Sequence, residues 1–165
     1  MRARGVTMTE LLMAATLVSL VSLGVGAIYG SSHTALTDTM VAGTLQREAA
    51  FALRHLSLTV RGGSALAWDA GATRLTVTIP TSFETPGVTR GEAYWRDAGA
   101  NTFRWAPDAS NLGTFQVLAQ NVTGFGSTLL NGDSAVQVTL TVANGSRAYT
   151  VTTTAACRGR LPNSN

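Results

Sequence analysis

The stretch Arg2-Ala-Arg-Gly5-Val6-Thr-Met-Thr-Glu10, together with the run from Leu11 to Ile28 that follows it, decides the fold. A basic tip ends in glycine, four uncharged residues come next, and one glutamate stands at the start of a long apolar run. No Arg, Lys, Asp or Glu occurs between Glu10 and Asp38. An apolar run of about 18 residues or more is long enough to cross a bilayer as a helix. We therefore expect a membrane-spanning helix with Glu10 at its edge, where a carboxylate is costly unless it is paired.

The basic tip predicts the orientation of this helix. Arg2 and Arg4 precede the apolar run, and positive charge on that side keeps it cytoplasmic. The remainder of the chain should then lie outside the cytoplasm. An ordinary cleaved secretory signal fits less well, because its apolar core is only about 7–15 residues long and a small-residue cleavage site should follow. A plain signal anchor, in which the glutamate has no role, is the simplest alternative.

The same residues resemble the N-terminus of type IV pilins and pseudopilins. In that family a short basic leader ends in glycine, prepilin peptidase cuts after it, and the fifth residue of the mature chain is glutamate. Gly5 matches the cleavage position and Glu10 matches the fifth mature residue. Val6 departs from the phenylalanine that the family most often has there. The resemblance implies cleavage between Gly5 and Val6, methylation of the new amine at Val6, and a role for Glu10 in assembly.

The family resemblance also implies partners and a location. A pilin-like precursor resides in the bacterial inner membrane as a single-pass protein and then enters a pilus or pseudopilus. Its partners are other pilin or pseudopilin subunits, prepilin peptidase, the membrane and the inner-membrane assembly platform. Glu10 would pair with the N-terminal amine of an adjacent subunit.

The bulk composition fits one domain with an anchor. The chain has 165 residues, of which only 13% are charged and 45% hydrophobic. Its net charge is +3, and loss of Arg2 and Arg4 with the leader would reduce this to +1. We expect no nucleic-acid partner, because nucleic-acid binding normally requires a clustered basic face. Cys157 is the sole cysteine and has no internal disulfide partner, which leaves a small, partly buried side chain or a cross-subunit disulfide.

Beyond the apolar run the helical pattern becomes amphipathic. A helix from Thr9 to Val60 would place one apolar stripe on a single face, formed by Leu45, Ala49, Ala52, Leu53, Leu56 and Val60. Gly62 and Gly63 should end it. Within the apolar part, glycines at 24, 26 and 30 provide either a soft point in the helix or close helix–helix packing.

The remainder of the chain has β character. The segment 74–79 alternates with period two, 92–96 and 102–105 flank a five-residue connection, and 81–91 reads as a loop. Short strands are expected near 115–118 and 121–125, followed by a turn at 131–133 and a terminal hairpin around Asn144-Gly145. We expect 64–157 to form one antiparallel sheet packed on the apolar stripe, an α+β fold. The aromatic residues of the 92–105 hairpin favour core packing over a carbohydrate-stacking platform.

These patterns divide the chain into five segments. They are a leader (1–5), an apolar transmembrane and polymerisation helix (6–30), its amphipathic continuation (31–61), an antiparallel β domain (62–157) and a flexible tail (158–165). Two further parts of the chain look like J-type pseudopilins and W-type minor pilins: the segment 45–56 at the end of the helix, and the segment 117–125 with the turn and terminal hairpin that follow it.

The sequence offers no arrangement for catalysis. It contains no Walker loop, no Gly-x-Ser-x-Gly elbow and no His-Glu-x-x-His motif. The two histidines, His33 and His55, have no partners at ligand spacing, so we expect no metal, no cofactor and no catalytic residue. Together with this absence, the resemblance to type IV pilins implies a structural subunit, a minor pilin or pseudopilin. The alternatives are a major pilin and a membrane-anchored binding domain that does not polymerise.

Overall fold

One helix and eight strands make up the computed structural model, which describes residues 7–80, 88–145 and 147–158. The helix, α1, spans Met8–Gly62 and contains no proline. It runs without a break through the glycines at 24, 26 and 30, and among the described residues no atom beyond the local helix backbone lies within 4 Å of a Cβ placed there. The chain divides into two compact units within α1, between Val41 and Ala42.

The first unit consists of α1 up to Val41, and its side chains are almost all exposed. An 18-residue window here has a mean hydropathy of 2.2, and none of that window is buried. By length and composition this helix is able to cross a membrane. Its hydroxyl groups donate back to carbonyls of the same helix: Thr16 to Met13 at 2.9 Å, Ser19 to Ala15 at 2.8 Å and Thr34 to Gly30 at 2.9 Å. These donors are therefore satisfied without water.

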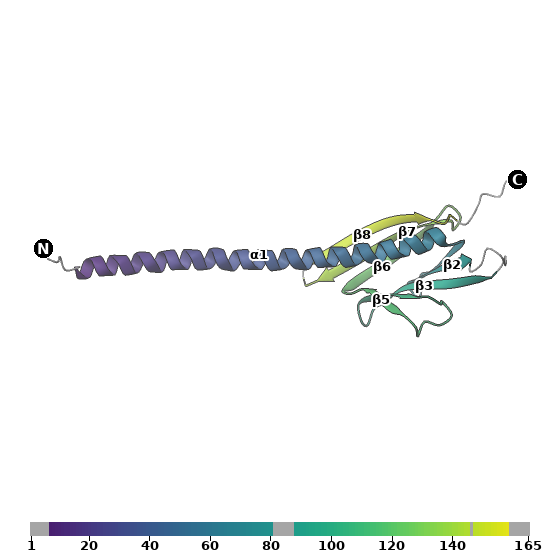
Figure 1. Cartoon of the computed structure of the whole chain (residues 1–165), viewed down its shortest axis with the longest axis horizontal. Coiled ribbons are helices and arrows are strands. Elements are labelled where there is room, and N and C mark those ends of the chain that lie inside the picture. Colours follow the sequence, from purple (N-terminus) through teal and green to yellow (C-terminus); the bar gives the residue numbers. More distant parts are fainter. Residues whose placement is uncertain (1–6, 81–87, 146, 159–165) are drawn as a thin grey trace. The chain divides into compact units, whose positions relative to one another are not determined.

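The second unit begins with the last turns of α1, which have a buried stripe. Leu45, Leu53 and Leu56 are each 3% exposed or less. The complete buried set matches the stripe predicted from the sequence: Leu45, Ala49, Ala52, Leu53, Leu56 and Val60. In Figure 1 these turns run beside strands of both sheets, with β7 and β8 on one side and β2 and β3 on the other. The predicted α+β fold, a helix packed on an antiparallel β domain, is confirmed.

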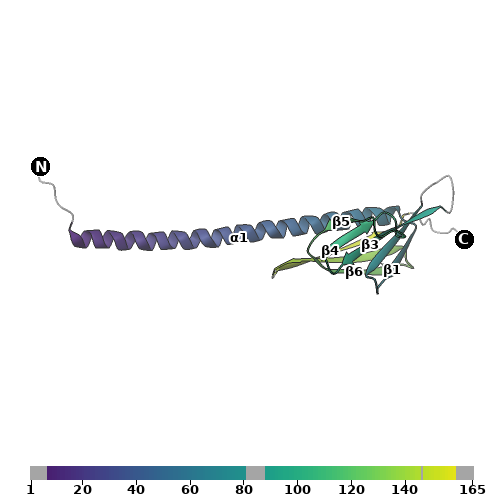
Figure 2. The ribbon, with the colours of Figure 1, turned by 90° about the horizontal axis from the view of Figure 1, so that it is seen from below.

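Five strands form the first sheet, in the order β1-β2-β3-β4-β5. All neighbours are antiparallel, so the chain makes a simple meander. Figure 2 shows β3, β4 and β5 close together at the last turns of α1. The bounds are β1 Ala65–Asp69, β2 Arg74–Pro80, β3 Thr89–Asp97, β4 Thr102–Ala106 and β5 Gln116–Ala119.

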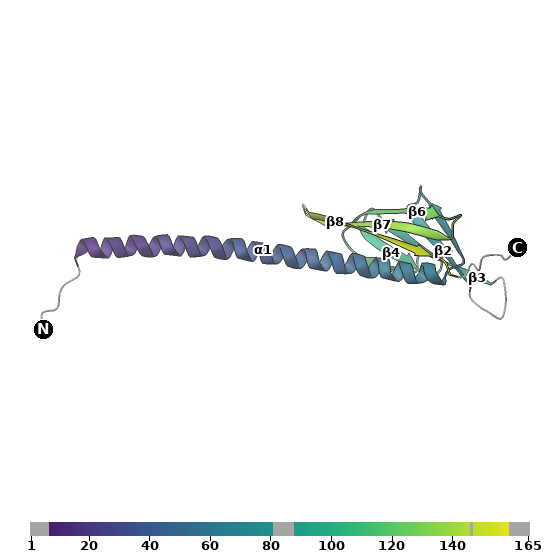
Figure 3. The same ribbon diagram turned by 90° about the horizontal axis from the view of Figure 1, so that it is seen from above.

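Three strands form the second sheet, in the order β6-β7-β8, and they lie side by side in Figure 3. Their bounds are β6 Val122–Leu130, β7 Ala135–Asn144 and β8 Arg147–Ala156. Val136, Val138, Leu140 and Val142 are all fully buried, as the alternation of this segment predicts. The turn that follows has Gly145 at a φ of +59°, a conformation that glycine adopts without steric cost.

The two sheets contact each other mainly through β6. Phe125 packs on Phe103 at a centroid distance of 4.7 Å and on Trp68 at 5.5 Å. The N–H of Val122 donates to the carbonyl of Asn101 at 2.8 Å, and Arg96 Nε donates to the carbonyl of Val122 at 2.8 Å. The core of the second unit therefore lies between two sheets and one helix.

Three expectations need correction. The single sheet expected over 64–157 is two sheets, because the chain leaves the first after β5. The expected loop 81–91 ends earlier, because Arg90 and Gly91 pair with Ile79 and Thr78 in the β2–β3 ladder, while 81–87 lie outside the described residues. Strand β1 was not expected at all. Of the expected flexible tail, 159–165 also lie outside the described residues.

Candidate functional site

The first candidate site is the beginning of α1. Gly5 and Val6, the predicted cleavage and methylation positions, lie outside the described residues. Glu10 lies in the first turn of the helix. Its Oε2 atom accepts two hydrogen bonds from Thr7, one from the backbone N–H and one from the hydroxyl, each at 2.9 Å. The backbone N–H of Glu10 lies 3.4 Å from Thr7 Oγ1.

This arrangement is a capping box. A threonine at the N-cap and a glutamate three residues later exchange side-chain-to-backbone hydrogen bonds, which satisfies donors that the first turn leaves unpaired. The sequence prediction treated the charge of Glu10 as unmet until a neighbouring subunit provides an amine. The structure instead gives the carboxylate a partner within its own chain. Only Oε2 takes part in these bonds, so Oε1 remains available for a second interaction.

The second feature is the apolar surface that follows Glu10. Leu11, Leu20 and Leu23 are 65%, 68% and 74% exposed. A soluble monomer rarely exposes a long, contiguous run of large apolar side chains with no charged residue among them, because water solvates such a surface poorly. The first unit is therefore compatible with surroundings of lipid or of other apolar helices.

A polar cluster joins α1 to the first sheet. The hydroxyl of Tyr94, on β3, donates to Thr59 Oγ1 at 2.7 Å and lies 3.0 Å from His55 Nδ1. Burial raises the pKa of Tyr94 well above its ordinary value, the bond to Thr59 opposes this rise, and the charge of Glu92 adds to it. The tyrosine is therefore neutral at any physiological pH and acts as a hydrogen-bonding link.

Glu92 extends this cluster. Its side chain is buried, and it accepts hydrogen bonds from Arg90 Nη2 and Trp105 Nε1, both at 2.8 Å. The indole of Trp105 in turn packs against the imidazole of His55 with a centroid distance of 4.9 Å. Each polar atom named here has a partner, so the cluster links α1 to the first sheet by satisfied hydrogen bonds.

The aromatic hairpin is engaged in packing. Tyr94 and Phe103 are fully buried, in line with the expectation from sequence. Trp95 and Phe115 form an edge-to-face pair with 6.0 Å between centroids, and the guanidinium carbon of Arg104 lies over the Phe115 ring at 4.2 Å from its centroid. This geometry does not leave a row of open rings on which a sugar would stack.

The remaining candidate residues are dispersed. His33 is exposed on α1, and Cys157 is half-buried after β8. Glu48 is half-buried and accepts a hydrogen bond from the N–H of Gln120 at 3.2 Å. Within residues 7–80, 88–145 and 147–158, no group of three or more His, Cys, Asp or Glu side chains is placed to hold a metal ion.

Comparison of the chain with protein-family models, with curated proteins and with solved structures finds no match.

Proposed function

We propose that this protein is a structural subunit, a minor pilin or pseudopilin, of a type IV pilus or type II secretion pseudopilus. The observation that carries the proposal is a division within α1. Its first part has no Arg, Lys, Asp or Glu between Glu10 and Asp38 and exposes mainly apolar side chains there, while its last turns are packed on a β domain of the same chain. A helix of this kind is suited to reside in a bilayer and then in a bundle of like helices.

In this proposal the leader 1–5 is removed by prepilin peptidase and the new amine at Val6 is methylated. The assembly platform then transfers the helix from the inner membrane into a filament, with the β domain outside. The chain would act by assembly and not by catalysis. A helix with this surface would equally serve a membrane-anchored binding domain that never polymerises, so the tests must separate assembly from anchoring.

The first test concerns processing. Intact-mass analysis of the protein from native membranes should show a chain that has lost residues 1–5 and gained one methyl group. Gly5→Leu should abolish this processing, whereas the neighbouring Ala3→Leu should leave it unchanged. A mature chain that begins at another residue would contradict the proposed class.

The second test concerns Glu10, and the capping box supplies its control. Glutamine at the third helical position can still reach back to the N-cap, whereas alanine cannot. In a low-dielectric filament core, a carboxylate paired with an amine interacts far more strongly than a surface ion pair, although desolvation offsets part of this gain. If the charge pairs with a neighbouring amine, Glu10→Gln and Glu10→Ala should both be inserted and processed, and both should be depleted from sheared filaments.

The two variants have distinguishable outcomes. Normal incorporation of Glu10→Gln, with loss only in Glu10→Ala, would assign Glu10 to helix capping and exclude the intersubunit pair. Normal incorporation of both variants would exclude any assembly role for this side chain. Absence of the wild-type protein from filaments, despite correct processing, would favour the anchored binding domain.

A further inference from the structure

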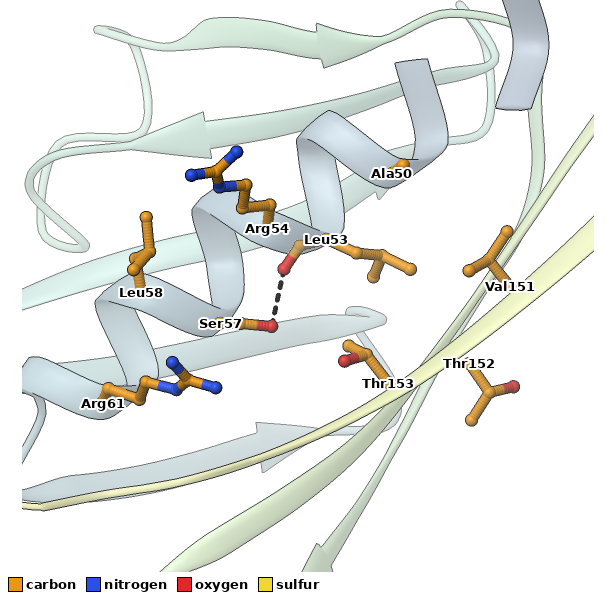
Figure 4. Close-up of a pocket in the computed structure, with 9 residues that line it drawn as sticks. All are labelled: Ala50, Leu53, Arg54, Ser57, Leu58, Arg61, Val151, Thr152 and Thr153. Atoms are coloured by element: carbon orange, nitrogen blue, oxygen red, sulfur yellow. Dashed lines mark hydrogen bonds between the residues drawn. The ribbon is translucent and has the colours of Figure 1, made fainter. Parts of the chain in front are cut away.

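A groove runs between the last turns of α1 and strand β8, with a volume of about 450 Å³. Figure 4 shows Leu53 and Val151 facing each other across it, with Arg54, Leu58 and Arg61 along the helix side. The helix contributes Ala50, Leu53, Arg54, Ser57, Leu58 and Arg61, and the strand contributes Val151, Thr152 and Thr153.

The strand side of this groove is a sheet edge. β8 pairs with β7 on one side, and no strand among the described residues pairs with its other side. The register and one hydrogen bond fix which backbone groups are free. The N–H of Cys157 donates to the carbonyl of Ser134 at 2.8 Å. Counting backwards along β8 from Cys157, every second residue therefore forms its backbone hydrogen bonds with β7. The residues between them direct their N–H and C=O groups outward, away from β7.

The outward-directed residues are therefore Thr150, Thr152 and Thr154. Cross-strand threonine pairs support this assignment: the hydroxyls of Thr139 and Thr152 lie 3.2 Å apart, and those of Thr141 and Thr150 lie 3.0 Å apart. Opposed side chains approach most closely in pairs that do not exchange backbone hydrogen bonds. Among the described residues, the outward-directed donors and acceptors of β8 have no strand partner, and they lie beside the groove. An added strand would present alternating backbone donors and acceptors that satisfy them.

The helix side of the groove adds positive charge. Arg54 and Arg61 are exposed and seven residues apart, about 10.5 Å along the helix axis. The ion pairs of the described residues, Asp69–Arg74, Glu92–Arg90 and Asp97–Arg104, leave both of these guanidinium groups without a carboxylate. Leu58 lies between them and is 58% exposed. The groove therefore combines a backbone edge, an apolar side chain and two uncompensated cations.

We propose that this groove binds an extended, acidic segment of another protein, which adds to β8 as a further strand and places carboxylates on Arg54 and Arg61. Strand addition takes its affinity from main-chain hydrogen bonds and its specificity from side chains that lie beside the edge. A second copy of this chain does not supply such a segment from its sheet edges. Among the edge strands β1, β5, β6 and β8, the one acidic residue is Asp69, which pairs with Arg74 at 3.6 Å.

This surface is independent of filament formation and of prepilin processing, so it can be tested on the isolated full chain in detergent micelles. The probe is a short fluorescent peptide that alternates valine and glutamate, since this pattern favours an extended strand with all carboxylates on one face. Controls are the same peptide with lysine in place of glutamate, and the acidic peptide with its alternate backbone nitrogens methylated. The latter keeps the charge and loses the donors of one edge.

Two sets of variants separate the charge from the edge. Arg54→Glu combined with Arg61→Glu should weaken binding by about tenfold or more, while Arg47→Glu, outside the groove on the same helix, should change it by less than about twofold. Thr152→Pro removes an outward N–H without removing a β7 ladder bond and should also cost about tenfold or more. Thr152→Ala, which keeps the N–H, should bind as the wild type does.

The proposal predicts binding of the acidic peptide alone among the three probes. Equal binding of the N-methylated peptide would overturn strand addition, and equal binding of the lysine peptide would overturn the role of the arginines. Absence of binding to all three, with a wild-type thermal melt, would overturn the proposal. So would concentration-dependent dimerisation of the chain that Thr152→Pro abolishes, because β8 would then pair with another copy.

Discussion

Residues 8–41 and residues 42–62 belong to one α-helix, yet their side chains have opposite surroundings. In the first part Leu17, Leu20 and Leu23 are all at least 64% exposed. In the second, Leu45, Leu53 and Leu56 are all at most 3% exposed. Helix propensity does not distinguish the two parts, since leucine favours helix in both. What differs is whether the chain itself provides a surface to cover the apolar residues.

This difference implies two sources of stability. The second part is stabilised by its own β domain, so its mutations should act on the unfolding free energy of a folded unit. The first part is covered by nothing in the described chain, and its mutations should act on insertion or assembly instead. Paired substitutions of the same residue type in the two parts test this separation directly.

The largest effect is expected for a charge in the buried stripe. Leu53→Asp places an unpaired carboxylate in the helix–sheet contact, which should cost more than the ~2–5 kcal/mol of a Leu→Ala truncation and unfold the β domain. Leu20→Asp, in the exposed part, should leave the unfolding transition unchanged but prevent membrane insertion. Tryptophan fluorescence during denaturation in detergent measures only the second unit, because it contains all three tryptophans, Trp68, Trp95 and Trp105.

An unchanged transition in Leu53→Asp would show that the β domain does not depend on the helix. A transition lowered equally by Leu20→Asp would show that the two parts of α1 are not separate sources of stability.

A smaller effect is expected where α1 ends against β2. A Cβ atom at Gly63 would lie 2.7 Å from Val77 Cγ1 and 3.2 Å from the carbonyl oxygen of Val60, and Val77 is fully buried. Gly63→Ala should therefore destabilise the domain by ~1–3 kcal/mol, as overpacking does. Gly62→Ala meets no atom within 4 Å and should be neutral or stabilising by up to ~1 kcal/mol. Equal midpoints for the two variants in urea denaturation would contradict this account.

The next effect concerns one hydroxyl group. Tyr94→Phe removes the bonds to His55 and Thr59 from a buried site and should lower stability by ~1–2 kcal/mol. Tyr29 is 74% exposed in the first part of α1, so Tyr29→Phe should change the unfolding free energy by no more than ~0.5 kcal/mol. Thermal melting followed by circular dichroism compares the two. If Tyr29→Phe lowers the melting temperature as much as Tyr94→Phe does, the exposed part of α1 contributes to domain stability.

Much of the fold was predictable because its signals are local. The apolar run, the stripe ending at Val60 and the Gly62-Gly63 stop predicted a helix from Thr9 to Val60, within two residues of its bounds. The clean alternation around Val138 and the Asn144-Gly145 turn predicted the β7–β8 hairpin. β1 gave no such signal, because five residues that include two alanines have low β propensity. The division into two sheets depends on pairing between distant segments and had no local signature.

The candidate sites were predictable in part for the same reason. Thr7-Met-Thr-Glu10 fits the capping-box pattern ahead of an apolar run, so the partner of Glu10 was readable from the sequence although the family resemblance suggested a different one. The link between His55 and Tyr94 joins residues 39 positions apart, and the groove along β8 depends on sheet order. Neither has a sequence pattern from which it follows.

The smallest effect is a pH dependence that should arise from the second unit alone. Asp97, the last residue of β3, accepts hydrogen bonds from the N–H groups of Gly99 and Ala100 at 2.8 and 3.2 Å and pairs with Arg104 at 2.6 Å. Hydrogen bonds from these backbone groups, chiefly that of Ala100, together with the charges of Arg104 and Arg96, hold the pKa of Asp97 below its ordinary value of 3.8. The ionised form is therefore favoured by folding.

Because the folded pKa is lowered, the contribution of Asp97 to stability is present above its ordinary pKa and is lost as the pH falls through the lowered one. Asp97→Asn keeps one acceptor oxygen but cannot ionise. Its unfolding midpoint should lie below that of the wild type at neutral pH, and the gap should close as the solution becomes strongly acidic. Urea denaturation followed by tryptophan fluorescence across this pH range provides the measurement. If the difference in unfolding midpoint between the wild type and Asp97→Asn stays constant across this pH range, Asp97 acts through hydrogen-bond geometry and not through its charge.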